Sequence, residues 1–207
     1  MKTQKTGLDL YKERGENTAL FAEPTNVLSN ISFFAAGLTA LPFCNGWVSG
    51  LLAAGCILVG IGSTLYHAYP KPLTKLCDVS AIVAWVLFYL FCWSHYFMGL
   101  NFLYSGGIII GFVLASLLFL RKYSGLLNGS SDYLPVIAVL LFSGAAGWYK
   151  TGHPHLIIAC IIAAISLVFR VIDNDVKLSS GTHFLWHIMN GFLMAQLTIF
   201  IAINVLN

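Results

Sequence analysis

Charge is what this sequence has least of. Only 9% of its 207 residues are charged, where about 25% is usual in a soluble domain. The chain is 58% hydrophobic, and 11 basic and 8 acidic residues give a net charge of +3. This composition excludes a disordered chain and an ordinary soluble enzyme. The small net charge also excludes a basic nucleic-acid-binding surface.

The sequence also lacks paired cysteines and an apolar leader. The five cysteines form no C-x-x-C pair and lie in or beside apolar runs, which favours buried small side chains over disulfides or a cysteine metal site. Residues 1–10 contain no apolar h-region. We therefore expect the first spanning helix, rather than a cleaved signal peptide, to target the chain.

What the sequence does contain is a series of apolar runs separated by short breaks. A membrane-spanning helix needs about 20 apolar residues, and backbone groups in lipid must be paired within their own segment, so the runs predict helices. Stretches such as 107–111 do not alternate as barrel strands would. The seven runs are roughly 27–42, 48–66, 76–97, 102–120, 133–148, 156–169 and 183–205.

These runs predict an all-α, polytopic membrane protein whose seven transmembrane helices form one bundle. We expect a single domain over 1–207, with a polar N-terminal segment at 1–24 and the bundle at 25–207. With seven spans, the N-terminal tail and the second, fourth and sixth loops share one side, which carries all of the lysines and arginines except Lys150. The positive-inside rule then places the N-terminus in the cytoplasm and the C-terminus outside, in a bacterial inner membrane or an internal eukaryotic membrane.

A few polar residues stand at the inner ends of the predicted spans. Ser63 and His67 are four residues apart at the end of the second span, so they share a helix face. Asp78 lies in the first turn of the predicted third span, and His183 and His187, again four apart, open the seventh. Because polar side chains are costly at membrane depth, each one is a hypothesis about function.

Three histidines with this spacing are typical of a metal site. Catalytic zinc takes three protein ligands and a water, and two imidazoles at i and i+4 can reach one ion. His67, His183 and His187 are therefore candidate zinc ligands, with Asp78 to deprotonate a water and Ser63 to donate a hydrogen bond to an oxyanion. The same spacing fits histidines that only hydrogen-bond between helices, and the residues alone leave both readings open.

The remaining histidines, His95, His153 and His155, fall near the opposite membrane face and are interpreted as interfacial residues.

Oxygen-bearing side chains gather just before the first span: Asp9, Glu13, Glu16, Asn17 and Glu23. Such a density of hard ligands can bind calcium, although a solvated or helix-capping tail has the same composition. Three more polar residues enter the first span at the same level and either line a polar pocket or bond neighbouring helices. They are Asn26, Ser29 and Asn30.

Several of these pieces occur together in one known family. Residues 22–30 (AEPTNVLSN), 62–68 (GSTLYHA), Asp78, 169–173 (FRVID) and 181–187 (GTHFLWH) stand in the family's order. On these residues the chain resembles the alkaline ceramidase family. That family belongs to a wider superfamily of seven-helix membrane hydrolases related to progestin and adiponectin receptor-like proteins.

The resemblance implies a zinc ion held by His67, His183 and His187, with Ser63 and Asp78 as catalytic residues. It implies hydrolysis of the amide bond of a ceramide-like lipid, which enters from the bilayer and yields a fatty acid and a sphingoid base.

The resemblance also implies a calcium site in the N-terminal segment, drawn from Asp9, Glu13 and Glu23. Aligning Glu23 with the family's last acidic ligand keeps Asp9 but puts Lys12 and Arg14 where an acid and an asparagine are expected. A shift by one residue keeps Glu13 and loses Asp9.

Other functions fit the same residues. One is a zinc hydrolase of another acyl lipid, and another is a receptor-like or structural seven-helix protein in which the metal only braces three helices. A transporter with a histidine relay would favour broken helices and charges at mid-membrane. No Asp, Glu, Lys or Arg stands near a predicted span centre.

Overall fold

A computed structural model describes residues 11–17, 19–127 and 129–205 of the chain. Within those ranges the regular structure is helical, without strands, and seven helical segments are long and apolar enough to cross a membrane. The segments are Pro24–Phe43, Trp47–Ala68, Pro72–Phe97, Phe102–Tyr123, Ser130–Thr151, Pro154–Val171 and His183–Asn204. The predicted all-α class and the seven predicted spans are confirmed.

The individual elements follow the spans closely. The first span is divided into α1 (Pro24–Ser29), α2 (Ile31–Ala40) and the short η1 (Leu41–Phe43), and the third into α4 (Pro72–Cys92) and the π-helical η2 (Trp93–Phe97). The fifth joins η3 (Ser130–Tyr133) to α6 (Leu134–Thr151). The remaining spans are single helices: α3 (Trp47–Ala68), α5 (Phe102–Tyr123), α7 (Pro154–Val171) and α8 (His183–Val205).

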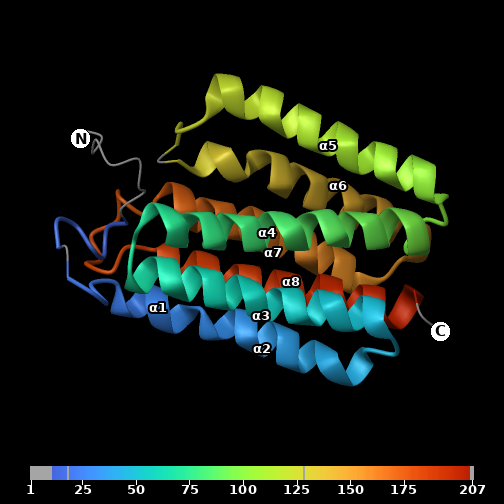
Figure 1. Cartoon of the computed structure of the whole chain (residues 1–207), viewed down its shortest axis with the longest axis horizontal. Helices are drawn as coiled ribbons and strands as arrows, with labels where there is room; N and C mark the ends of the chain where they lie inside the picture. The colour runs from blue at the N-terminus through green and yellow to red at the C-terminus, as the bar shows by residue number, and fades with distance from the viewer. Residues whose placement is uncertain (1–10, 18, 128, 206–207) are drawn as a thin grey trace.

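Helix α8 lies inside the bundle, where it packs against α2, α3 and α7. Large side chains from α3, α4 and α8 fill the core, among them Leu52, Tyr89, Leu197 and Ile201, each almost wholly buried. Helix α5 lies at the edge of the bundle, beyond α6 (Figure 1), and only Ser105 of it is buried. The inner helices α3 and α8 are therefore the ones placed to build a protected site.

The start of α4 differs from the predicted start. Pro72 occupies the first helical position, which its fixed φ and missing N–H suit. The backbone N–H of Lys71 donates to the Thr74 hydroxyl at 2.9 Å and caps the helix there. Because α4 begins four residues earlier than expected, Asp78 lies in its second turn rather than its first.

A glycine brings α3 and α4 together beside the predicted site. A Cβ built on Gly62 would lie 3.0 Å from the Cα of Asp78 and 3.0 Å from the carbonyl oxygen of Cys77. Only glycine allows the two backbones to approach this closely. The contact sets Asp78 next to the face of α3 that carries Ser63.

The cysteines are free, as expected, but they are not all buried. Cys56 and Cys92 are buried, Cys44 and Cys160 are half-buried, and Cys77 is exposed. The prediction of a buried side chain is therefore wrong for Cys77. Its side of α4 faces outward, where lipid rather than protein would cover it.

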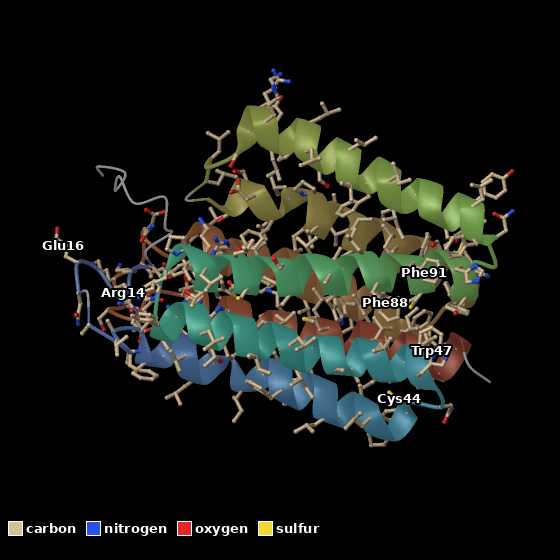
Figure 2. All side chains as sticks on the ribbon, viewed as in Figure 1. Arg14, Glu16, Cys44, Trp47, Phe88 and Phe91 are labelled. Atoms are coloured by element: carbon tan, nitrogen blue, oxygen red, sulfur yellow. The ribbon has the colours of Figure 1, made fainter. Side chains whose placement is uncertain are left out.

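The two ends of the bundle differ in character. Figure 2 shows Arg14 at the end where α1 begins, with Glu16 pointing away from the bundle, and Cys44 and Trp47 at the opposite end. Arg14 is buried, whereas Glu16 is exposed. The end that holds α1 and the start of α8 thus contains charge inside the protein.

Candidate metal centre

The three predicted histidine ligands meet inside the bundle. His67 comes from the last turn of α3, and His183 and His187 come from the first turns of α8. Each is no more than 3% exposed, and one potential ligand atom from each lies within 4.8 Å of the others. This buried group can hold a metal ion, as the spacing predicted.

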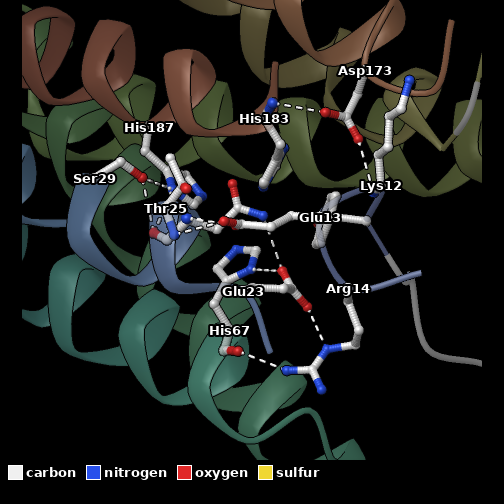
Figure 3. Close-up of polar contacts among 12 residues, drawn as sticks. Lys12, Glu13, Arg14, Glu23, Thr25, Ser29, His67, Asp173, His183 and His187 are labelled. Carbon is white, nitrogen blue, oxygen red and sulfur yellow. Dashed lines mark hydrogen bonds and ion pairs between the residues drawn. The ribbon is translucent and has the colours of Figure 1, made fainter. Parts of the chain in front are cut away.

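Two of the rings, those of His67 and His187, are oriented by oxygen atoms that contact their Nδ1 atoms. The Nδ1 of His67 lies 2.5 Å from Oε2 of Glu23, and an ionised carboxylate can only accept. The Nδ1 of His187 lies 3.2 Å from the carbonyl oxygen of Asn26 and 2.8 Å from Oγ of Ser29. Figure 3 shows these contacts of the two rings with Glu23 and Ser29. With a proton on each Nδ1, the lone pair of Nε2 is left for an ion.

The third ring has a different partner. The guanidinium of Arg170 donates from Nη1 to Nδ1 of His183 at 3.2 Å. The backbone N–H of His183 donates to Oδ1 of Asp173 at 2.8 Å, and that of Thr182 donates to the same oxygen at 2.6 Å. Asp173 thus satisfies backbone donors at the start of α8, where an anion is favourable. The carboxylate of Asp173 therefore fixes the position of the His183 backbone.

Glu23 is a buried, ionised carboxylate. Burial by itself would raise its pKa, but the hydrogen bonds from His67, Arg14 and Asn26 lower the pKa below the ordinary value. Oε1 accepts from Nε of Arg14 at 2.6 Å, and Oε2 accepts from the Asn26 amide at 3.0 Å. The carboxylate therefore remains a charged acceptor for His67.

The N-terminal segment 11–14 closes the same end of the bundle. The ring of Tyr11 stacks on that of His183 with centroids 3.7 Å apart, and the backbone N–H of Lys12 donates to Oδ2 of Asp173. Glu13 accepts from the backbone N–H groups of Thr25 and Asn26. The composition of this N-terminal segment also fitted a solvated tail, but Tyr11, Lys12 and Glu13 contact the bundle.

The two predicted catalytic residues are buried near the histidines. Ser63 is 2% exposed and shares a face of α3 with His67. Asp78 is 6% exposed, and its Cα lies against Gly62 of α3, next to Ser63 in the chain. Its Oδ1 has no hydrogen-bond partner among the described residues. Asp78 therefore has an acceptor atom that protein groups do not occupy.

The predicted calcium ligands do not form one cluster of open oxygens. Asp9 lies outside the described residues. Glu13 caps the first turn of α1, and Glu23 binds Arg14 and His67. In the part of the chain that the structure describes, the carboxylates of Glu13 and Glu23 are already engaged by protein donors.

The other three histidines lie away from this centre, as predicted. Nδ1 of His95 contacts the carbonyl oxygen of Leu100 at 2.8 Å. His155 contacts Gln196, and the rings of His153 and His155 lie against each other.

Sequence reasoning missed the roles of Tyr11, Arg14, Arg170 and Asp173. Arg170 and Asp173 carried a usable signal, because an arginine followed three residues later by an aspartate is unusual at the end of an apolar span. Tyr11 and Arg14 carried none, since nothing in their spacing distinguishes them from a solvated tail.

A narrow apolar cavity adjoins the centre. It is lined by Phe33, Val86, Tyr133, Trp186 and Leu193, together with the polar Asn190. The ring of Phe33 lies 5.9 Å from that of His187, and Trp186 precedes His187 in α8. The histidine centre therefore borders a hydrophobic space within the bundle.

No family model and no curated protein matches this chain.

Proposed function

We propose that the protein is a zinc-dependent intramembrane hydrolase that cleaves the amide bond of a ceramide-like lipid. The observation that carries the proposal is the buried group of three histidines, whose potential ligand atoms lie within 4.8 Å of one another. Beside it lie an aspartate with an unoccupied oxygen and an apolar cavity.

The donor set fits zinc. Zinc prefers neutral imidazoles, and catalytic sites commonly use three protein ligands. Ligating histidines usually give their second nitrogen to a carboxylate or carbonyl group, as His67 and His187 do here. A zinc ion held by His67, His183 and His187 would polarise a carbonyl group and make water acidic enough to ionise near neutral pH.

The protein's own groups can carry the proton transfers. Oδ1 of Asp78 accepts a proton from water as the water oxygen bonds to the amide carbon. The hydroxyl of Ser63 donates a hydrogen bond to the carbonyl oxygen as charge develops there. Asp78 then delivers the proton to the nitrogen, the C–N bond breaks, and a fatty acid and an amine leave.

The surroundings favour a lipid as the substrate. The centre lies inside a bundle of membrane-spanning length, at the ends of the helices rather than at their middle. An amphiphile entering from the bilayer could place its amide at the histidines and an apolar chain along the cavity that includes Phe33 and Leu193. The lining side chains would have to move apart to admit a whole acyl chain.

Metal analysis of the purified protein tests the first part of the proposal. We expect one zinc ion per chain, lost in each of His67→Ala, His183→Ala and His187→Ala. His153→Ala, which alters a histidine outside the centre, should retain the zinc. A wild-type protein that takes up no zinc would refute the proposal.

Hydrolysis assays test the second part. With zinc bound, the wild type should release fatty acid from an N-acylsphingosine, and Asp78→Asn should lower the rate by about 10²–10⁴-fold while retaining zinc. A zinc-loaded wild type that cleaves esters but no amide lipid would point to another acyl lipid. A zinc-loaded protein that cleaves neither would point to a metal that braces three helices.

A further inference from the structure

Arg14 is a buried cation surrounded by oxygen atoms. The side chain is 2% exposed. Its Nε donates to Oε1 of Glu23 at 2.6 Å, and Nη2 donates to the carbonyl oxygen of His67 at 2.9 Å. Nη1 donates to the carbonyl oxygens of Asn17 at 3.1 Å and Ala19 at 2.9 Å. One carboxylate and three backbone carbonyls thus share a single positive charge.

Such a set of oxygens is what calcium collects in proteins, where carboxylates and backbone carbonyls are its usual ligands. Here the guanidinium lies among them. A second cation at the same place would displace the arginine or meet its charge at close range. The residues present therefore do not fit the calcium ion that the family resemblance implies for this segment.

We propose that Arg14 is a built-in cation that takes the place of a bound divalent ion and positions the metal ligand His67. The connection runs through one carboxylate, because Oε1 of Glu23 binds Arg14 while Oε2 binds Nδ1 of His67. Figure 3 shows this chain of contacts from Arg14 through Glu23 to the ring. Nη2 also binds the backbone carbonyl of His67, so the same guanidinium holds the histidine from two sides.

The inference rests on the proposed metal centre and is independent of lipid hydrolysis. In the wild type, zinc affinity should not change with calcium. Arg14→Ala removes the guanidinium and leaves the four oxygens, so the variant should bind zinc about 10–100-fold more weakly, as is common when a ligand's supporting group is lost. Millimolar calcium should restore much of that affinity.

Competition with a zinc chelator, with and without calcium, measures these changes in the full-length protein in detergent. Arg121→Ala is the matched control, because Arg121 is an exposed arginine on α5. It should bind zinc as the wild type does at every calcium concentration. If Arg14→Ala does not fold, Arg14→Lys replaces it, since lysine keeps the charge but cannot reach four oxygens, and an intermediate zinc affinity is expected.

Thermal unfolding supplies a second measurement that needs no zinc. Calcium should raise the melting temperature of Arg14→Ala and leave that of the wild type unchanged. The inference is overturned if calcium tightens zinc binding or raises the melting temperature of the wild type. It is also overturned if a folded Arg14→Ala binds zinc like the wild type or does not respond to calcium. A wild type that binds no zinc would instead refute the proposed function, and the melting temperatures would still decide the role of Arg14.

Discussion

Arg170 donates to Nδ1 of His183 at 3.2 Å, the ring nitrogen that His67 and His187 use as a donor. A guanidinium has no acceptor atom, so Nδ1 of His183 must accept, and a neutral ring then carries its proton on Nε2. His67 and His187 have the opposite tautomer. Without metal, the neutral ring of His183 therefore has its proton on Nε2, and the positive charge of Arg170 lies beside it.

Replacing this arginine should strengthen metal binding. Arg170→Gln removes a buried charge that repels a cation at the histidines, and it frees Nδ1 of His183 to carry the proton. We expect zinc to bind about tenfold more tightly, equivalent to about 1.4 kcal/mol, in a chelator competition. Arg121→Gln, on exposed α5, should leave the affinity unchanged. Weaker zinc binding in Arg170→Gln would show that the arginine supports the bound state instead.

The glycine contact between α3 and α4 gives a prediction about packing. A methyl group at Gly62 would meet the backbone of Cys77 and Asp78, so Gly62→Ala should lower the free energy of unfolding by about 1–3 kcal/mol. It should also slow hydrolysis, because Asp78 is moved. Gly107→Ala, where no atom lies within 4 Å of the new Cβ, should instead be neutral or stabilising by up to about 1 kcal/mol. Thermal unfolding in detergent compares the two.

Asp173 should stabilise the start of α8 and also support metal binding. Asp173→Ala leaves the N–H groups of Thr182 and His183 without their acceptor, which costs about 0.5–2 kcal/mol of unfolding free energy. Because His183 loses its backbone anchor, zinc affinity should fall as well. Asp175→Ala, which changes an exposed carboxylate two residues away, should alter neither. Equal zinc affinity in the two variants would show that Asp173 caps α8 without supporting zinc binding.

The lowered pKa of Glu23 predicts how stability depends on pH. A carboxylate whose pKa is lowered in the folded protein stabilises it fully above the unfolded value of about 4.5. That stabilisation is lost as the pH falls through the folded pKa. Without metal, the wild type should therefore lose more stability between pH 5 and pH 3 than Glu23→Gln does, in thermal unfolding at each pH. Parallel curves for the two proteins would contradict the ionised carboxylate at this position.

The seven helices and the three histidines could be predicted because each leaves a local signal. Apolar runs give the spans. The i, i+4 spacing pairs His183 with His187, and the four spans between the second and the seventh bring His67 to the same end. The start of α4 was misplaced because apolar character begins at 76, whereas Pro72 and its cap set the first turn. The cytoplasmic side of the N-terminus stays a prediction.

The supporting contacts could not be predicted, because they depend on segments that meet only after folding. Arg14 and Glu23 look like tail charges in the sequence, and their contacts with His67 need α3 beside α1. The hydrogen bond from Arg170 to His183 and the stacking of Tyr11 likewise come from tertiary placement. Sequence patterns predict which side of a single helix is apolar or polar. They do not predict the contacts of a loop that packs over the end of another helix.

The contacts of residues 11–14 have a consequence for the order of synthesis. Tyr11 and Lys12 are made well before their partners, because His183 and Asp173 belong to the seventh span and the loop before it. Since the chain emerges from its N-terminus, the pocket cannot close until the seventh helix has been translated and inserted. A metal ion held by all three histidines could therefore be bound only after the segment with His183 and His187 has been made.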